Sequence, residues 1–328
     1  MVSGDFFELT TERDSVLSIG VFDGVHLGHQ HLLRQVVARA RQAGRLSVAV
    51  TFNPRPREVL RPNLPSEYVI TLDERIRLIG ELGFDCVPVL EFTREVAATP
   101  AEKFVRTLRR RYRMAELWVG PDFALGRGRG GTIPVLRELG AELGFTVGVV
   151  EPFELDGEIV SSTLIHQKLA EGDVAAAGRL LGRLPAATGE VVAGAGRGRT
   201  LGVPTANVGV PDRLALPANG VYAVCCRFVG KPAGRVTYGS SRPQPSGNGA
   251  PRASLLGVAN VGTRPTFDNG RRTLEVHLLD FSADVYGAQL RVEFVQRLRP
   301  ERRFPSAEAL LDQIRRDIGA ARAVLGCR

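Results

Sequence analysis

The sequence predicts an α/β doubly wound domain followed by a small, mostly-β domain that closes with a helix. Its 328 residues exceed the roughly 250 to 300 at which a single core stops growing, which favours two domains. Strand-like and helical patterns alternate from residue 16 to about residue 150, as in a parallel sheet covered by helices. Beyond residue 185, short strand-like runs between glycine and proline turns favour a barrel or sandwich. We therefore expect domains at residues 1–185 and 186–328.

Apolar periodicity and helix start signals predict the elements of the first domain. Thr71 and Thr99 each stand three residues before a glutamate, so both are expected to cap helices. Pro100 would then occupy the first position of the second of these helices. The other expected elements are strands at 16–21, 46–52, 86–90, 117–120 and 146–150, and helices at 30–43, 134–143 and after Ser161 or Ser162.

The second domain is expected to be built mainly from short strands. Ser306 is expected to cap a final helix with an apolar stripe. The stretch 230–254 is rich in glycine, serine and proline, so we expect a long mobile loop there. The expected strands are 191–192, 220–228, 255–261, 273–279 and 289–297.

The composition narrows the classes of function. A formal charge of +8 is compatible with a nucleic-acid-binding protein. The arginine-rich run 106–113, however, is best interpreted as the solvated face of a helix. Small polyanions such as nucleotides explain a basic surface equally well, so no nucleic-acid partner is expected. No apolar run is long enough to span a membrane and no signal-peptide pattern is present, which predicts no membrane partner and a cytoplasmic location. Four cysteines without zinc or disulfide spacing are expected to be reduced packing residues.

The stretch 18–29 is the strongest candidate site. An apolar strand runs into a turn containing Gly20 and Gly24 and then into a helix, which places His26 and His29 at the helix N-terminus. Unpaired backbone N–H groups and the helix dipole favour a phosphate there, and two imidazoles add donors. The alternative interpretation is an ordinary surface turn.

Three further loops follow predicted strands, where ligands collect in doubly wound sheets. They are 52–56, 120–128 and the Ser-Ser-Thr at 161–163. Each also has a plain interpretation as a turn or a helix cap. Their joint placement at strand ends beside the histidine turn favours a shared site.

Two features of the second domain point to phosphate chemistry. The glycine-rich run 194–207 ends in Pro-Thr-Ala-Asn, and the oxygens of Thr205 and Asn207 suit Mg²⁺. It is not a Walker A motif, and a flexible linker is the alternative. Strand alternation places Glu275 on the face opposite Leu274 and Val276. Glu275 is therefore either a general base or part of a solvated strand face.

Together these motifs resemble the bacterial bifunctional riboflavin kinase/FMN adenylyltransferase (FAD synthetase) family across nearly the whole chain. The resemblance implies an N-terminal nucleotidyltransferase domain of the class I aminoacyl-tRNA-synthetase-like type and a C-terminal six-stranded riboflavin kinase barrel. The substrates it implies are ATP, riboflavin and FMN, with Mg²⁺ as cofactor. The motifs occur in the family's order at 20–29, 119–123, 161–163, 202–207, 260–267 and Glu275.

The resemblance also implies roles for individual residues. In the first domain His26 and His29 would be catalytic. ATP would contact Gly20, Phe22, Asp23, Gly24, His26, Gly28, His29, Ser161, Ser162 and Thr163, and FMN would contact Asn53, Asp122 and Phe123. In the second domain Glu275 would take the proton of the ribityl 5′-hydroxyl, and Thr205 and Asn207 would hold Mg²⁺. The nucleotide there would also meet Gly194, Gly202 and Pro204, and the flavin would meet Asn260, Gly262, Thr263, Arg264, Pro265, Thr266 and Arg303.

Two positions depart from the family's pattern. Arg55 stands where the family usually has histidine, and His166 stands where it usually has arginine. A largely neutral histidine lacks the permanent charge and planar donor fork of arginine, although Arg55 would restore a charge if it lies close to His166. Two alternatives follow: a riboflavin kinase whose adenylyltransferase half is impaired or altered, and a flavin-sensing binding protein.

Overall fold

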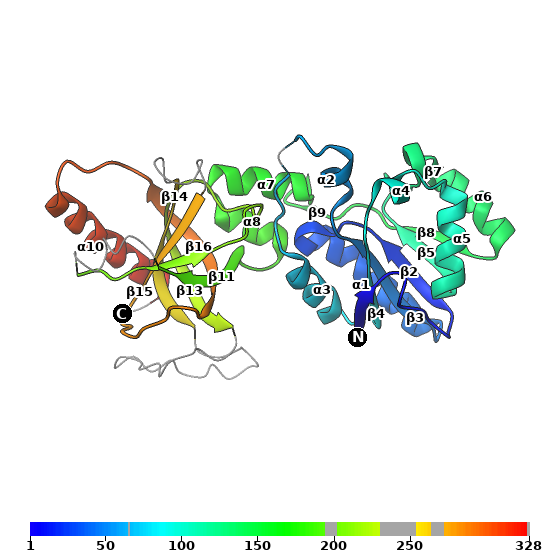
Figure 1. The fold of residues 1–328 in the computed structure, drawn as a ribbon, viewed down its shortest axis with the longest axis horizontal. Coiled ribbons are helices and arrows are strands. Elements are labelled where there is room, and N and C mark those ends of the chain that lie inside the picture. Colours follow the sequence, from blue (N-terminus) through cyan, green and yellow to red (C-terminus); the bar gives the residue numbers. More distant parts are fainter. Residues whose placement is uncertain (65, 194–201, 230–253, 264–271, 327–328) are drawn as a thin grey trace. The chain divides into compact units, whose positions relative to one another are not determined.

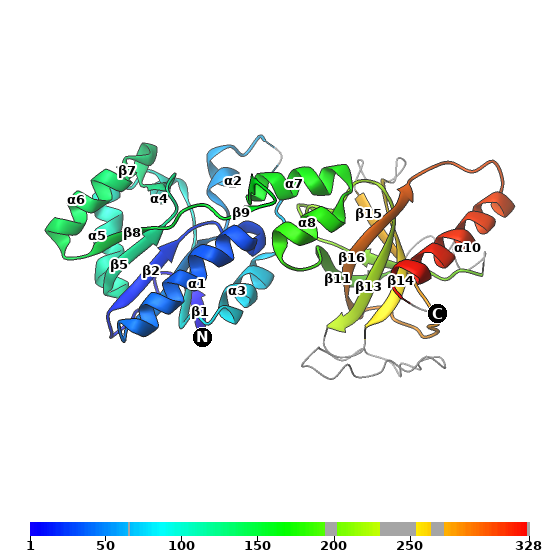
Figure 2. The same ribbon diagram turned by 180° about the vertical axis from the view of Figure 1, so that it is seen from behind.

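The structure is a computed structural model that describes residues 1–64, 66–193, 202–229, 254–263 and 272–326. Its contacts divide the chain into two compact units, Met1–Ser162 and Thr163–Arg328. Figures 1 and 2 show the first as a sheet covered by helices and the second as a barrel with helices of its own. This division groups α8 (Val174–Leu181) and all of α7 (Ser162–Glu171) but its first residue with the barrel.

The first unit is a six-stranded parallel sheet, which confirms the doubly wound prediction. The strand order is β1-β4-β3-β2-β5-β8. The chain moves outward from β2 through β3 to β4 and then returns to build β5 and β8 on the other side of β2. The strand order therefore reverses between β2 and β5, where such sheets bind ligands. The strands are β1 (Val2–Asp5), β2 (Ser15–Ile19), β3 (Leu46–Phe52), β4 (Cys86–Leu90), β5 (Met114–Val119) and β8 (Thr146–Val149).

Helices cover both faces of this sheet (Figures 1 and 2). One face carries α1 (Leu27–Gln42) on β2 and β3, and α3 (Leu72–Glu81) beside β4. The other carries α5 (Ala101–Tyr112) on β5 and α6 (Ile133–Leu143) on β8. Shorter elements are η1 (Asp23–Val25), α2 (Pro56–Leu60), α4 (Arg94–Ala97), η2 (Arg127–Arg129) and the hairpins β6 (Ala124–Leu125) with β7 (Gly131–Thr132) and β9 (Glu154–Leu155) with β10 (Glu158–Ile159).

Local signals predicted one helix start correctly and another wrongly. The Thr71 side chain accepts a hydrogen bond from the backbone N–H of Glu74, as expected of an N-cap. Thr99 is not the cap of α5, because its hydroxyl donates to the carbonyl of Glu95 in the unpredicted helix α4, and Pro100 occupies the cap position. A short preceding helix thus claims the Thr99 side chain that the sequence pattern assigns to the next one.

The second unit is a closed antiparallel barrel in the order β11-β12-β15-β14-β13-β16. It confirms the predicted small β domain, in its barrel form. The helix α10 (Ala307–Val324) packs on β13, β14 and β16, and the Ser306 hydroxyl caps it by accepting the N–H of Ala309. The strands are β11 (Ala186–Val192), β12 (Ala206–Gly209), β13 (Gly220–Val229), β14 (Leu255–Thr263), β15 (Arg272–Leu278) and β16 (Gln289–Pro300).

Two other predictions meet the structure only in part. The expected loop at 230–254 lies outside the described residues except for Ser254. Cys86 and Cys226 are buried free thiols, as expected of packing residues, and Cys225 is half-buried. Among the helices of the described residues, none combines the length and apolar character needed to cross a bilayer.

Candidate functional sites

The turn after β2 holds an unusual backbone. Phe22 and Val25 have left-handed φ values of 49° and 39°, and Gly24 between them has φ 82°. Such a conformation costs on the order of 1–3 kcal/mol for each non-glycine residue and persists only where surrounding contacts enforce it. A Cβ on Gly28 would lie 2.9 Å from the carbonyl oxygen of Val160 and 3.1 Å from the His26 ring, so only glycine fits there. The 22–25 turn is thus tightly constrained.

The two histidines of this turn lie against each other. Their ring centroids are 3.6 Å apart with an interplanar angle of 21°. His26 caps α1 by accepting the backbone N–H of His29 at Nδ1, 3.2 Å away. Because Nδ1 is an acceptor, the neutral His26 ring carries its proton on Nε2 and can donate only from there. The sequence placed both residues at the helix start, but this capping role was not predicted.

His29 is held in its neutral form. Its Nδ1 is buried and has no hydrogen-bond partner among the described residues. Burial, the neighbouring His26 and the charge of Arg75 together lower the pKa of His29 well below the ordinary value of 6.5. The stacked pair therefore offers a phosphate hydrogen-bond donors rather than two full charges.

The other predicted loops of the first unit follow strands adjacent to β2. Asn53 follows β3, and Asp122 and Phe123 follow β5. Because β3, β2 and β5 are neighbours, their carboxyl ends bring these loops and the 22–25 turn to one edge of the sheet. Asn53 is exposed and lines a cavity of about 370 Å³ with Asp5, Pro54, Val89 and Glu91.

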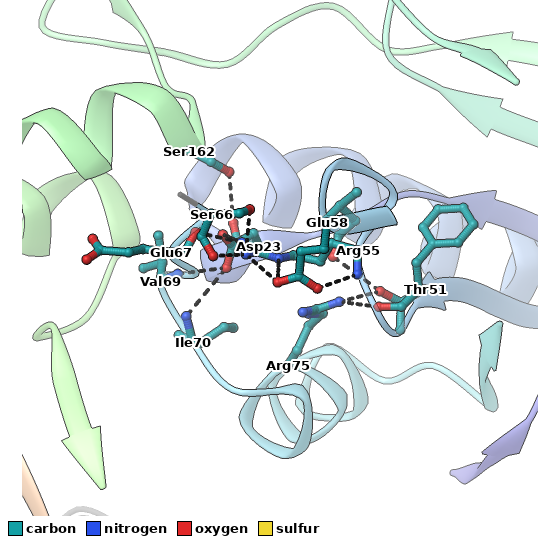
Figure 3. Close-up of polar contacts among 12 residues, drawn as sticks. Asp23, Thr51, Arg55, Glu58, Ser66, Glu67, Val69, Ile70, Arg75 and Ser162 are labelled. Carbon is teal, nitrogen blue, oxygen red and sulfur yellow. Dashed lines mark hydrogen bonds and ion pairs between the residues drawn. The ribbon is translucent and has the colours of Figure 1, made fainter. Parts of the chain in front are cut away.

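The Ser-Ser-Thr segment meets the same turn. The Ser162 hydroxyl donates to the backbone carbonyl of Asp23 at 3.0 Å (Figure 3). Ser161 is half-buried, Thr163 is exposed, and α7 begins at Ser162, as predicted for a short helix opening there. Residues 139 positions apart thus lie side by side at the carboxyl end of β2.

The Arg55 side chain is buried among protein groups, although its charge would favour a position exposed to solvent or to a ligand. It forms ion pairs with Asp23 at 3.1 Å and with Glu58 at 2.8 Å. It also donates to the backbone carbonyls of Ser66 and Glu67, both at 2.8 Å. The guanidinium is therefore committed to protein groups. The expectation that Arg55 lies close to His166 and restores a charge there stays a prediction.

In the barrel, strand register brings three predicted residues into one row. Asn207 on β12 lies directly opposite Glu275 on β15, and Glu275 lies opposite Asn260 on β14. Directly opposed residues project from the same face, so the three side chains share one side of the sheet. All three are half-buried, whereas the flanking Leu274 and Val276 are buried in the core. The carboxylate thus lies between two amides.

His277 lies on the same face, two residues along β15 from Glu275, although it was not predicted as a site residue. Its Nδ1 lies 2.8 Å from the backbone carbonyl of Pro204, and this contact anchors the Pro-Thr-Ala-Asn segment to β15. A carbonyl only accepts, so Nδ1 carries the proton. Alternation had already placed His277 on the face of Glu275, which was the available signal.

The remaining predicted barrel residues are placed as follows. Gly202 has a left-handed φ of 74° and free space where a Cβ would be. The Thr263 hydroxyl accepts from the amide of Asn219 at 3.0 Å, and a Cβ on Gly262 would meet Glu301. Arg303 is exposed. Gly194, Arg264, Pro265 and Thr266 lie outside the described residues.

Comparisons with known proteins cover both units. A family model described as FAD synthetase matches residues 8–164, and one described as riboflavin kinase matches residues 181–325. The Escherichia coli K12 protein named bifunctional riboflavin kinase/FMN adenylyltransferase is 38% identical over 316 residues, covering 96% of this chain and 94% of its own. The Pseudomonas fluorescens protein of the same name is 40% identical over 314 residues, covering 95% and 93%.

A solved structure supports the same relationship at the level of the fold. The crystal structure named as a macrolide-efflux protein from Streptococcus pneumoniae has a TM-score of 0.84 and 30% identity, covering 98% of this chain and 99% of that chain. The two family models follow each other along the chain in the order of its two units. The chain therefore belongs to the family of bifunctional riboflavin kinases/FMN adenylyltransferases.

Proposed function

We propose that this chain phosphorylates riboflavin to FMN with one ATP and adenylylates FMN to FAD with a second ATP. The observation that carries the proposal is that two family models, one for each activity, match successive parts of the chain. Relatives that align with nearly the whole chain bear both activities in their names. Adenylylation is assigned to residues 1–185, which comprise the first unit together with α7 and α8, and phosphorylation to residues 186–328. The kinase-only and flavin-sensing alternatives gain no support from the comparisons. The efflux name of the solved relative is not carried over, because both family models describe flavin enzymes.

For adenylylation, the turn after β2 would bind the ATP phosphates. An FMN phosphate oxygen attacks the α-phosphorus, the bond to the bridging oxygen breaks, and pyrophosphate leaves. No covalent intermediate with the chain is required, so the chain contributes alignment and charge stabilisation. The Nε2–H of His26 would donate toward the phosphates, and the neutral ring of His29 would add a second donor. The Asn53 and Asp122 loops, from the adjacent strands, would hold FMN.

For phosphorylation, Glu275 is the general base. It takes the proton from the ribityl 5′-hydroxyl while that oxygen attacks the γ-phosphorus, and ADP leaves. The flanking Asn207 and Asn260 restrict the orientation of the carboxylate by sharing its face. His277 holds the carbonyl of Pro204 and so fixes the chain just before Thr205 and Asn207.

The donor set around Asn207 suits Mg²⁺. A threonine hydroxyl, an amide oxygen and a nearby carboxylate are hard oxygen ligands, which Mg²⁺ prefers together with substrate phosphates and water. Thr205 and Asn207 would hold the ion. Its chemistry there is to neutralise charge on the transferred phosphoryl group.

One experiment tests both halves. The purified full chain is incubated with riboflavin, ATP and Mg²⁺, and flavins are resolved by chromatography at successive times. We expect FMN first and FAD after it, while FMN supplied directly gives FAD without a lag. Absence of FMN formation from riboflavin contradicts the kinase assignment, and absence of FAD from supplied FMN contradicts the adenylyltransferase assignment.

A further inference from the structure

A cluster of alternating charges supports the strained turn that carries the candidate catalytic histidines. Asp23, Arg55 and Glu58 are joined by ion pairs, and Arg75 lies near enough to feel their charges while donating to the Thr51 hydroxyl and the Phe52 carbonyl (Figure 3). The guanidinium of Arg55 has five N–H donors. Nη1 donates to Asp23 at 3.1 Å and to the carbonyl of Glu67 at 2.8 Å. Nη2 donates to Glu58 at 2.8 Å and to the carbonyl and hydroxyl of Ser66 at 2.8 and 3.0 Å, and Nε donates to Glu58 at 3.3 Å.

These contacts occupy every donor of Arg55 with protein oxygens. Its side chain is only 9% exposed, and its carboxylate partners Asp23 and Glu58 are 8% and 12% exposed. The Tyr68 ring lies over the guanidinium carbon at 5.3 Å from the ring centroid. Arg55 is thus enclosed by protein groups, so its guanidinium holds neighbouring segments together and is not available to a phosphate. We call this set of contacts the clamp.

The clamp acts on Asp23, which links three separate segments. One carboxylate oxygen accepts from Arg55, and the other accepts the backbone N–H groups of Val69 at 2.9 Å and Ile70 at 3.4 Å. Its backbone carbonyl accepts from Ser162. Figure 3 shows these bonds converging on Asp23 from Arg55 just before α2, from the 66–70 segment and from the start of α7.

Asp23 also lies inside the strained turn. Phe22 precedes it with φ 49°, and Gly24 and Val25 follow with φ 82° and 39°. A left-handed β-branched residue persists only when its surroundings hold it in place. His26 comes next and caps α1, so the direction of both histidine rings depends on this turn.

We propose that Arg55 is a positioning residue for adenylyl transfer, which fixes Asp23 and thereby holds the 22–25 turn that presents His26 and His29 to the nucleotide. Arg55 itself does not touch the phosphates. This inference rests on the proposed adenylyltransferase activity of the first unit. It assigns Arg55 to alignment, where its charge alone suggested phosphate binding.

The test compares Arg55→Met and Arg55→Lys with Arg77→Met in the full chain. Arg77 is a matched control, because it pairs with Glu74 at 2.8 Å and with Glu81 on α3 in the same unit, yet is 44% exposed. Misplacing catalytic groups by about 1 Å costs roughly 100-fold in rate. We expect Arg55→Met to lower FAD formation from FMN by that factor, mainly in kcat. Arg55→Lys keeps the charge but not the planar donor fork, so its rate of FAD formation should lie between those of Arg55→Met and the wild type.

The rate of riboflavin phosphorylation by the same samples is the internal control. It should stay within about twofold of the wild-type rate, because the contacts of Arg55 and the strained 22–25 turn both lie in the first unit. The imidazole NMR signals of His26 and His29, assigned by substituting each in turn, give a readout independent of turnover. Their pH titrations should shift in Arg55→Met and stay unchanged in Arg77→Met. A role in stability alone would lower the melting temperature without moving these titrations.

Several outcomes overturn the proposal. They are wild-type FAD formation by Arg55→Met, an equal loss in Arg77→Met, a parallel loss of both activities, and unchanged histidine titrations. If Arg55→Met fails to fold, Arg55→Lys decides, and failure of that variant to fold also contradicts a positioning role. A wild-type chain that makes no FAD contradicts the proposed function itself, a result that the Arg55 variants cannot produce.

Discussion

The two units place their candidate catalytic groups on opposite kinds of scaffold. In the first, His26 and His29 follow a turn with left-handed residues that a buried charge cluster holds in place. In the second, Glu275, Asn207 and Asn260 lie on regular strands, and register alone aligns them. A turn can direct backbone N–H groups at a phosphate, which strands cannot, but it depends on remote contacts. We therefore expect the first unit to be sensitive to substitutions away from its site, and the second to be sensitive mainly to the row itself.

The largest expected effect separates the two activities. Glu275→Gln removes the proposed base while keeping the size and shape of the side chain and one of its two acceptor oxygens. We expect FMN formation to fall by roughly 10²- to 10⁴-fold, as for loss of a positioned general base. FAD formation from supplied FMN should stay at the wild-type rate. Kinetics with each flavin supplied separately check this, and a kinase rate within threefold of wild type would show that Glu275 lies on a merely solvated strand face.

The reverse separation uses His26. His26→Asn keeps a side-chain acceptor for the helix cap but loses the imidazole donor, whereas His26→Ala loses both. We expect both variants to lose roughly 10²- to 10³-fold in FAD formation, as for removal of one preorganised donor. Only His26→Ala should also be destabilised, by about 1 kcal/mol. Rate measurements beside denaturant unfolding distinguish the two losses, and full activity in His26→Asn would confine His26 to capping.

A substitution at His166 tests whether FAD formation is limited by the histidine that stands where the family usually has arginine. His166→Arg adds a permanent charge and a planar donor fork. We expect FAD formation to rise roughly threefold to tenfold, equivalent to about one additional charge-assisted hydrogen bond. Gln167→Arg, one residue along an exposed part of the same helix, should leave the rate unchanged. Equal increases in both variants would attribute the gain to surface charge instead.

The smallest effect concerns the pH dependence of stability. The pKa of His29 is lowered in the folded chain, so below the ordinary value of 6.5 the unfolded chain binds a proton that the folded chain does not. Stability of the first unit should therefore decrease as pH falls from 6.5, by up to about 1.4 kcal/mol per pH unit. Thermal unfolding of the full chain between pH 7 and pH 5 measures this. His29→Gln should reduce the slope, and an unchanged slope would show that another group causes it.

Much of the architecture could be read from local patterns. The apolar runs of β3 and β4 have the predicted limits, because a strand buried on both faces needs a continuous apolar stretch. The edge strand β1 was missed, since its four residues show no apolar alternation and are largely exposed, and only pairing with β4 makes it a strand. α4 was missed as well, and with it the true partner of Thr99. Such elements depend on neighbours that periodicity does not describe.

For the sites, local patterns were enough to predict the types of residue and the strand ends that carry them. Glycine spacing, helix start signals and strand alternation are local properties, so they placed His26, His29 and Glu275 correctly on their elements. Which of these groups meet depends on contacts between distant segments of the folded chain. The row of Asn207, Glu275 and Asn260 requires strand register, and the clamp on Asp23 requires residues 32 to 139 positions away in the chain. The role of Arg55 changed for that reason, because its charge is visible in the sequence and its partners are not.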